Sequence, residues 1–137
     1  PFQTIQYRPS DELPCEDYPL LMSTGRILYH YNVGTQTRRD AGLNMKRAAN
    51  FIEMHPEDAR RLGVQDGDMV TVQSRRGEIQ ATVMPSPRMQ LGCVWMPFHF
   101  AESNTNRLTN DAGDACTGTG EYKVCAVRVL SGSAAAK

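Results

Sequence analysis

Two neighbouring segments of this chain alternate between apolar and polar residues with the two-residue period of a β-strand. Residues 69–73 and 78–83 carry the alternation, and the intervening residues 74–77 read Ser-Arg-Arg-Gly, a composition typical of a turn. The pattern predicts two antiparallel strands that share one apolar face. The residues expected on that face are Val70, Val72, Ile79, Ala81 and Val83. Because such a face must be buried, the chain has to fold around a sheet.

Four further short segments have the composition of strands. They are residues 20–24, 51–54, 93–96 and 124–129, each dominated by apolar side chains. The prolines at positions 85 and 87 are expected to end the strand that begins at residue 78. At least six short strands with few helices can bury both faces of their sheet by closing it on itself. We therefore expect a mainly β fold in the form of a closed barrel.

One short helix is predicted at residues 56–62. Pro56 suits the first helical position, and Gly63 can end the helix in the left-handed conformation. His55 directly precedes the helix and is expected to cap it. Residues 25–44, by contrast, contain recurring glycine, asparagine and threonine without a helical apolar period, so we predict that they are mostly loop.

The length of 137 residues is enough for one domain with its own hydrophobic core. Residues 1–17 are polar, aperiodic and interrupted by prolines, so we expect a linker or N-terminal extension. Residues 18–130 are expected to form the barrel domain. The remaining residues, 131–137, read Ser-Gly-Ser-Ala-Ala-Ala-Lys and are expected to be a disordered tail.

The composition argues against several classes of partner and site. Fifteen Lys and Arg residues balance fifteen Asp and Glu residues, so no net charge attracts nucleic acid. No apolar run approaches the length needed to cross a bilayer, so no membrane association is expected. The four cysteines are widely separated and lack the spacing of zinc or iron–sulfur ligands, so no metal site is expected. A soluble, reducing, cytoplasmic environment fits these features.

An anion-binding site is indicated where the first strand ends. Thr24 and Gly25 follow the apolar residues, and glycine lets the backbone approach a ligand closely while N–H groups face its phosphate oxygens. Arg26 and the arginine pair at 38–39 offer planar cations suited to bidentate phosphate contacts. The alternative is an ordinary corner between strand and loop. The hydroxyls and amide of residues 34–37 favour a site, because their interval is too irregular for packing.

Four sequence blocks carry a resemblance to a known family. Residues 24–39 contain Thr-Gly-Arg and then His-Tyr-x-x-Gly-Thr-x-Thr-Arg-Arg. Residues 96–100 read Met-Pro-Phe-His-Phe, residues 106–109 Asn-Arg-Leu-Thr, and residues 121–128 Glu-Tyr-Lys-x-Cys-Ala-Val-Arg. In this order the blocks closely resemble the C-terminal domain of formate dehydrogenase large (alpha) subunits, which belong to the molybdopterin oxidoreductase (DMSO reductase) family. The resemblance covers residues 7–129.

The resemblance implies a six-stranded double-psi β-barrel with a few short helices. It also implies a cofactor, bis(molybdopterin guanine dinucleotide) with molybdenum or tungsten. The metal ligand of such enzymes would precede this chain, so no catalytic residue and no metal ligand is expected here, and the isolated chain should be inactive. The residues at cofactor-binding positions of the family are Thr24, Gly25, Arg26, His30, Thr35, Thr37, Asn106, Tyr122 and Lys123.

Three of these candidates also have purely structural interpretations. Asn106 belongs to a polar cluster at residues 104–111 that could be a solvated turn with a helix cap, although its amide also matches the edge of a pterin or guanine ring. His30 lies between two tyrosines and could stack with them at the surface. Lys123 could be an exposed charge beside the last strand. For His99, between two phenylalanines, we expect a structural or supporting role.

By this resemblance, the chain would hold the cofactor as the C-terminal domain of a formate dehydrogenase, an oxidoreductase that converts formate to carbon dioxide. Its partners would be the remaining domains of the large subunit, with their iron–sulfur and catalytic centres, and electron-transfer subunits. One alternative is the same domain of a nitrate reductase or another molybdopterin oxidoreductase. A second is a stand-alone double-psi barrel that binds a protein, which would need an exposed apolar groove or a basic stripe.

Overall fold

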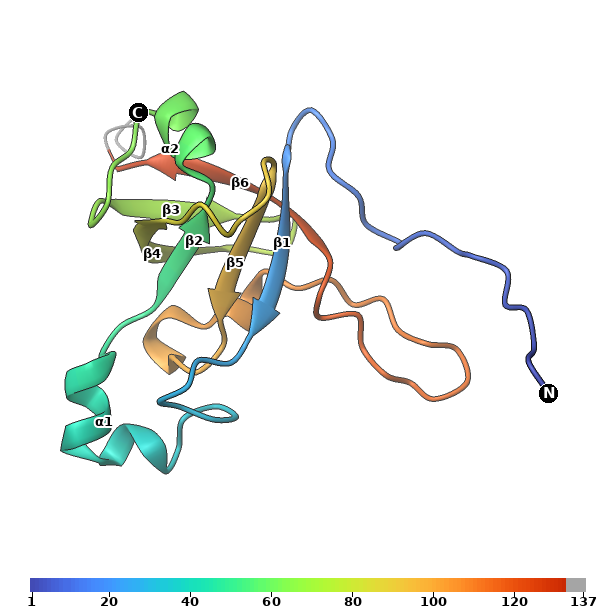
Figure 1. Cartoon of the computed structure of the whole chain (residues 1–137), viewed down its shortest axis with the longest axis horizontal. Helices are drawn as coiled ribbons and strands as arrows, with labels where there is room; N and C mark the ends of the chain where they lie inside the picture. Colours follow the sequence, from blue (N-terminus) through green and yellow to red (C-terminus); the bar gives the residue numbers. More distant parts are fainter. Residues whose placement is uncertain (133–137) are drawn as a thin grey trace.

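A computed structural model describes residues 1–132 of the chain. Six strands close into a barrel in the order β1-β5-β2-β4-β3-β6 (Figure 1). The strands are β1 (Leu20–Gly25), β2 (Phe51–Met54), β3 (Met69–Gln73), β4 (Glu78–Pro85), β5 (Cys93–Pro97) and β6 (Cys125–Ser131). The helices are η1 (Thr37–Arg39), α1 (Ala41–Lys46), α2 (Pro56–Leu62), η2 (Ala101–Ser103) and η3 (Thr105–Arg107), of which the η elements are 3₁₀ turns.

The strand pairing has an internal symmetry. Two of the pairings are parallel, β1 with β5 and β2 with β4. The other four are antiparallel. Replacing each strand by the strand three places away in the chain leaves this pattern unchanged. The fold is the double-psi β-barrel that the resemblance implied, and the prediction of a mainly β, six-stranded fold is confirmed.

The hairpin predicted from the alternating pattern is present. Val70 pairs with Ala81 and Val72 with Ile79, in the register that the shared apolar face requires. All of the residues expected on that face are buried. Strand β4 continues two residues past the predicted end, because its last residue, Pro85, is still aligned with Met54 of the parallel strand β2.

Side chains fill the interior of the barrel. Met22, Ile52, Met54, Val94 and Met96 have no exposed surface. Burying a side chain of this size contributes about 1.5–3 kcal/mol to folding, so the packed interior is the main source of stability. A filled small barrel has no room for a ligand along its axis. A binding site must therefore lie at an end of the barrel or on its outer surface.

Helix α2 forms with the predicted ends. His55 Nδ1 accepts a hydrogen bond from the Glu57 backbone N–H at 3.1 Å, and Gly63 ends the helix in the left-handed conformation with a φ of 68°. Residues 25–44 are mostly loop, as predicted, and the exceptions are η1 and the part of α1 that lies in this range. Asp40 caps α1 by accepting from the Leu43 backbone N–H at 2.8 Å. No residue of α1 is buried, which is why no apolar period marks it in the sequence.

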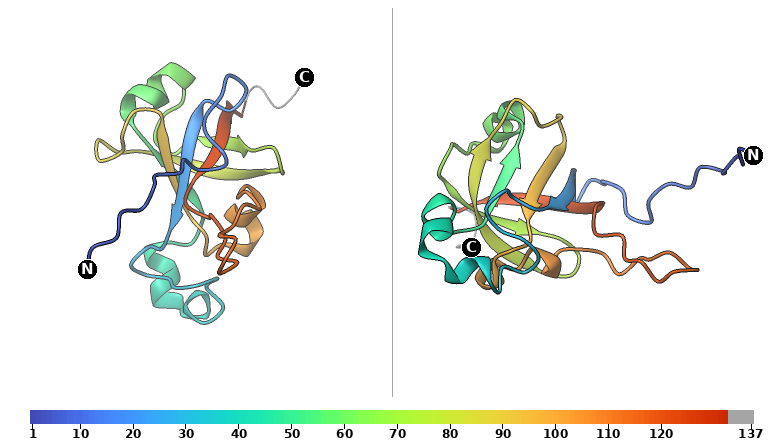
Figure 2. Two further views of the ribbon diagram at one scale, coloured as in Figure 1. Left: turned by 90° about the vertical axis from the view of Figure 1, so that its right-hand side faces the viewer. Right: turned by 60° about the horizontal axis from the view of Figure 1, so that its bottom comes forward.

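The N-terminal extension is attached to the barrel. Residues 1–17 have no helix or strand, but the Glu12 carboxylate accepts hydrogen bonds from the Arg76 guanidinium and from the Ala126 backbone N–H. Figures 1 and 2 show this extension and the loop before β6 projecting from the same side of the barrel. Ser10 and Cys15 of the extension also contact the domain, through Glu121 and Arg75, and the boundary between residues 17 and 18 stays a prediction.

The C-terminal boundary differs from the expected one. Strand β6 extends to Ser131, which is aligned with Val70 of β3, so residue 131 belongs to the barrel and not to a tail. The sequence did not mark this position, because serine after Val-Leu has the composition of a turn rather than of a strand. Residues 133–137 of the predicted tail lie outside the described residues.

Candidate functional site

A pocket with a volume of ≈ 380 Å³ opens where the parallel strands β1 and β5 end. Gly25 and Pro97, the last residues of these strands, are aligned. In Figure 1 the two arrowheads lie side by side, and the chain continues from them into the loops that form the pocket. We call this hollow the candidate pocket. Its lining residues are Thr24, Arg26, Asn32, Val33, Phe98, Asn106, Tyr122 and Lys123.

Hydrogen bonds join two distant segments in the wall of the candidate pocket. The Thr24 hydroxyl donates to the Tyr122 carbonyl oxygen at 2.7 Å, and the Lys123 ammonium donates to the Thr24 carbonyl oxygen. The end of β1 is thereby fixed to the segment that leads into β6. The Thr24 hydroxyl is bonded inside the wall, whereas Tyr122 is exposed and its side chain lines the pocket, where it can contact a ligand.

Two cations flank one aromatic ring in the candidate pocket. Arg26 Cζ lies 5.2 Å and Lys123 Nζ 5.7 Å from the centre of the Phe98 ring. Each such contact contributes roughly 0.5–1 kcal/mol at an exposed site, which restrains both charged groups at the pocket. The lining residues include no Asp or Glu. The pocket is therefore a local concentration of positive charge in a chain with no net charge, and it favours an anionic ligand.

Two carboxamides complete the polar lining. The cluster around Asn106 contains both a helix cap and a pocket residue. The Asn104 side chain caps η3 by accepting from the Asn106 backbone N–H at 3.1 Å, and Asn106 itself lines the pocket. Asn32 has a φ of 48°, and its side-chain oxygen accepts from the Arg26 guanidinium at 2.9 Å. Asparagine tolerates this left-handed conformation better than other residues that carry a Cβ.

His99 supports the loop that carries Arg26 and Asn32. Its imidazole is fully buried, with Nδ1 donating to the Asn32 carbonyl oxygen at 2.6 Å and Nε2 accepting from the Ile27 backbone N–H at 3.1 Å. Burial lowers the pKa of His99 below its usual value. The charges of His30 and Arg26 act in the same direction, while the bond to Asn32 opposes them. This arrangement agrees with the supporting role expected for His99.

Of the nine predicted binding residues, the structure brings five together: Thr24, Arg26, Asn106, Tyr122 and Lys123. Sequence reasoning missed Asn32, Val33 and Phe98. Phe98 lies in one of the blocks that carried the resemblance, so its aromatic side chain was an available signal. Nothing local marked Asn32 or Val33, because their positions depend on how the loop folds back against His99.

Four predicted residues do not line the candidate pocket, and three of them, His30, Thr35 and Thr37, lie in the loop and the 3₁₀ turn that follow β1. His30 is buried, with Nε2 donating to the Arg47 carbonyl oxygen at 2.8 Å and Nδ1 lying 3.2 Å from the Thr37 hydroxyl. The His30 ring and the Thr37 hydroxyl are therefore bonded to each other. Because His30 is buried, it does not stack with tyrosines at the surface, as the alternative interpretation required. Thr35 is exposed outside the pocket. The assignment of these three residues to a cofactor stays a prediction.

Gly25 is also outside the lining, and its structural reason differs from the expected one. A Cβ at this position would lie 2.7 Å from Trp95 Nε1. The indole of the neighbouring strand is thus one reason for glycine at this position, and the assignment of Gly25 to a cofactor stays a prediction.

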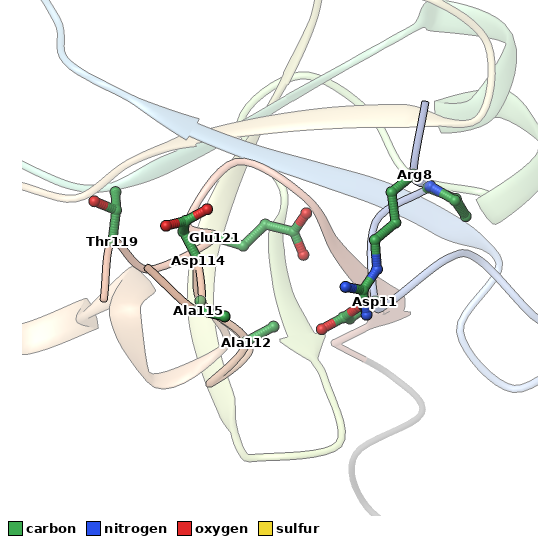
Figure 3. Close-up of a pocket in the computed structure, with 9 residues that line it drawn as sticks. Arg8, Asp11, Ala112, Asp114, Ala115, Thr119 and Glu121 are labelled. Atoms are coloured by element: carbon green, nitrogen blue, oxygen red, sulfur yellow. Dashed lines mark ion pairs between the residues drawn. The ribbon is translucent and has the colours of Figure 1, made fainter. Parts of the chain in front are cut away.

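A second hollow, of ≈ 460 Å³, lies between the N-terminal extension and the loop before β6. Figure 3 shows Arg8 and Asp11 on one side and Asp114 and Glu121 on the other. Three carboxylates thus face a single guanidinium, and Arg8 is already within 4.0 Å of Asp11. Carboxylates repel phosphate, so this hollow suits an anionic cofactor less well than the candidate pocket does.

The described part of the chain has neither a cluster of metal-binding side chains nor a helix that could span a membrane. Within residues 1–132, no group of three or more His, Cys, Asp or Glu side chains is arranged to hold a metal ion. Over the same residues, no helix has the length and apolar character that crossing a bilayer requires.

A solved structure shares the architecture of this chain. Acetylene hydratase from Pelobacter acetylenicus superposes with a TM-score of 0.77 at 15% sequence identity, covering 90% of this chain and 21% of that chain. At this low identity the likeness concerns the fold alone. It supports the assignment of the barrel topology.

Several relatives are far more similar in sequence. The chain is 45% identical over 128 residues to F420-dependent formate dehydrogenase 2 subunit alpha of Methanococcus maripaludis, covering 93% of this chain and 19% of the relative. It is 47% identical over 125 residues to F420-dependent formate dehydrogenase subunit alpha of Methanocaldococcus jannaschii, covering 91% and 19%. A nitrate reductase of Symbiobacterium thermophilum is 46% identical over 128 residues, covering 90% and 17%.

The chain spans about a fifth of the length of these relatives. Residues 20–126 match the family described as "Molydopterin dinucleotide binding domain". That match includes all six strands up to the first residues of β6 and every residue that lines the candidate pocket. The chain therefore belongs to the molydopterin dinucleotide binding domain family.

Proposed function

We propose that the candidate pocket binds part of bis(molybdopterin guanine dinucleotide), and that the chain is the C-terminal domain of a formate dehydrogenase alpha subunit with molybdenum or tungsten. One observation carries the proposal. Five residues assigned to the cofactor from family position, drawn from three distant segments, converge on a single pocket. If these residues had only structural roles, at a strand corner, in a solvated turn and at a sheet edge, nothing would require them to line the same pocket.

The chemistry of the lining fits the cofactor. Arg26 and Lys123 offer cationic donors for phosphate oxygens. Asn32 and Asn106 offer carboxamides, which can pair with the donor and acceptor edges of a guanine or pterin ring. The exposed ring of Tyr122 provides a surface for stacking. When bound, the cofactor and its metal would supply the two-electron chemistry, and this chain would hold the cofactor in position.

The proposed reaction is formate oxidation to carbon dioxide, supported by two relatives that are named as formate dehydrogenase alpha subunits. The remaining domains of such a subunit, with iron–sulfur and catalytic centres, and electron-transfer subunits would be its partners, in the cytoplasm. Nitrate reduction is the second candidate, because a nitrate reductase is equally similar to this chain. The choice of substrate would rest with the other domains.

The proposal is tested in the full-length subunit with Arg26→Ala, Asn106→Ala and Lys123→Ala. A lost hydrogen bond to a charged group weakens binding by about tenfold to hundredfold, so cofactor content should fall while the melting temperature changes little. Arg8→Ala is the matched control, because Arg8 lies in the acidic hollow and is an exposed arginine of the same chain. Val72→Ala, in the core, should lower the melting temperature first.

The measurements are metal and guanine nucleotide content, turnover with formate and with nitrate, and melting temperature. Wild-type cofactor content in all three pocket variants would show that the candidate pocket does not bind the cofactor. A stand-alone barrel that binds a protein would then be the better interpretation. If the subunit turns over nitrate but not formate, the pocket assignment stands and the proposed reaction becomes nitrate reduction.

A further inference from the structure

We infer that His99 is a positioning residue of the candidate pocket: its neutral imidazole holds both ends of the loop formed by residues 27–32 and so fixes Arg26 and Asn32 in the pocket wall. The geometry is direct. One ring nitrogen bonds the Ile27 backbone N–H at the start of the loop, and the other bonds the Asn32 carbonyl oxygen at its end. A single buried side chain therefore closes the loop on itself.

The two bonds require one protonation state. Nε2 must be an acceptor for the Ile27 N–H, and Nδ1 must be a donor to the Asn32 carbonyl oxygen. Only the neutral tautomer with its proton on Nδ1 satisfies both. An imidazolium would place a second N–H against the N–H of Ile27, and that end of the loop would separate from the ring.

The cationic groups around His99 disfavour a positive charge on its imidazole. Arg26 precedes the loop, the His30 ring centre lies 5.9 Å from the His99 ring centre, and Lys123 lies over the adjacent Phe98. Arg38 passes nearby, since a Cβ added to Gly34 would touch both the Arg38 side chain and the His99 carbonyl oxygen.

The Glu102 carboxylate, three residues after His99, is already bonded to Arg38. Glu102 pairs with Arg38 through both of its oxygens, at 2.6 and 2.8 Å. The charges of His30 and Arg26 act against protonation of His99, and the bond to the Asn32 carbonyl oxygen acts in the opposite direction. His99 is therefore neutral at neutral pH, and acidification is the natural way to break its bond to Ile27.

The loop needs such a restraint because of its backbone. Asn32 has a positive φ, which is unfavourable for a residue with a Cβ, and its side chain and carbonyl oxygen are each bonded, to Arg26 and His99. Without His99, the turn at Asn32 loses one of the two bonds that hold it. The Arg26–Asn32 pair would then no longer be fixed relative to Phe98 and Lys123 across the pocket.

Two isosteric variants separate the two bonds. In His99→Asn the amide group takes the place of Nδ1, so the bond to Asn32 can be kept and the acceptor for Ile27 is lost. In His99→Gln the amide group reaches the place of Nε2, so the acceptor for Ile27 can be kept and the donor to Asn32 is lost. The matched control is His55→Asn, a histidine at the helix α2 cap where asparagine also serves as a cap.

The first readout is the exchange protection factor of the Ile27 amide in the 137-residue chain, without ligand. We expect at least a tenfold loss in His99→Asn, a smaller loss in His99→Gln and no change in His55→Asn. The wild-type chain should keep this protection at neutral pH and lose it as the pH falls through the pKa of His99, which burial places below its usual value. Chemical shifts of the His99 ring carbons should follow the same titration, which distinguishes it from a titration of His30.

The second readout, cofactor content of the full-length subunit, rests on the proposed function. We expect both His99 variants to lower it at least fivefold, with His55→Asn unchanged. Unchanged Ile27 protection in the variants and in acid would overturn the inference, whatever the pocket binds. So would wild-type cofactor content in the His99 variants when Arg26→Ala and Lys123→Ala lower it. If no pocket variant lowers the content, the proposed function fails, and Ile27 protection alone decides the role of His99.

Discussion

The indole of Trp95 covers Gly25 so closely that a Cβ at position 25 would lie within 2.9 Å of three of its ring atoms. The contact joins β1 to its parallel neighbour β5 at the residue between Thr24 and Arg26, both of which line the candidate pocket. Trp95 is also packed against Phe51 of β2, with ring centres 5.7 Å apart, so the indole has little freedom to move. The end of β1, and with it the position of Arg26, depends on this fit.

Replacing Gly25 with alanine should therefore destabilise the barrel and displace the pocket wall. Overpacking by a methyl group costs about 1–3 kcal/mol, so the melting temperature should fall and the Trp95 fluorescence should change. Gly77→Ala is the control, because a Cβ there makes only an ordinary contact, at 3.5 Å, with the Arg107 carbonyl oxygen. Equal melting temperatures for the two variants would show that Trp95 moves aside readily.

Glu12→Gln should detach the N-terminal extension from the barrel. The Glu12 side chain is only 10% exposed and accepts from Arg76 and from the Ala126 backbone N–H. Losing charged hydrogen bonds costs about 1.5–3 kcal/mol, and limited proteolysis should cut residues 1–12 faster. Glu16→Gln, at an exposed position of the same segment, should leave both properties unchanged. Similar proteolysis of the two variants would mean that Glu12 is not the anchor.

Acid should weaken the same anchor. Burial alone would raise the pKa of Glu12, but the hydrogen bonds from Arg76 and Ala126 and the charges of Arg76 and Arg75 outweigh it, so the pKa lies below its usual value. The unfolded chain then binds a proton more readily than the folded chain. The stabilisation by Glu12 is complete above the ordinary glutamate pKa of about 4.3 and is lost as the pH falls through the lower folded value.

The measurement is the melting temperature of wild type and Glu12→Gln from pH 7 to pH 3. The difference between the two proteins should be constant above about pH 5 and should shrink towards zero in acid. Two parallel curves over the whole range would contradict the prediction.

Amide exchange should distinguish the strands from the loops. Strands β3 and β4 pair over their whole length and carry buried side chains, so their amides should be the last to exchange. Residues 110–120 are held mainly by local turns and by one bridge between Gly113 and Gly120, and should exchange early. Residues 33–44 should also exchange early. Protection in residues 110–120 equal to that in β3 would contradict this order.

The strands could be predicted because each carries its own apolar signal. Phe51–Met54 and Met69–Gln73 have the predicted ends, and the short helix that begins at Pro56 follows from its proline and from Gly63 at its end. Helix α1 could not be predicted, because it is exposed and is held by a cap at Asp40 rather than by packing. The order of strands around the barrel is set by contacts between distant residues, so the family resemblance supplied it and periodicity did not.

The candidate pocket was predictable in part for the same reason. Arg26 and Lys123 lie next to strand ends, where a family position carries over with little change. His30 and Thr37 lie in a loop whose path depends on long-range bonds, and the structure directs both side chains inwards. Asn32 is held at the pocket by bonds that the sequence does not reveal, from His99 to its carbonyl oxygen and from Arg26 to its side chain.

The order of the strands has a consequence for how the chain folds. Among the described residues, each of the six pairings joins one of β1, β2 and β3 to one of β4, β5 and β6. Neither half of the chain contains a pairing of its own, and only β3 and β4 are consecutive neighbours. Most of the loop-closure entropy must therefore be lost before the sheet gains its hydrogen bonds. Folding should be slow and cooperative, and a chain cut within residues 74–77 should give two fragments that acquire structure only by folding together.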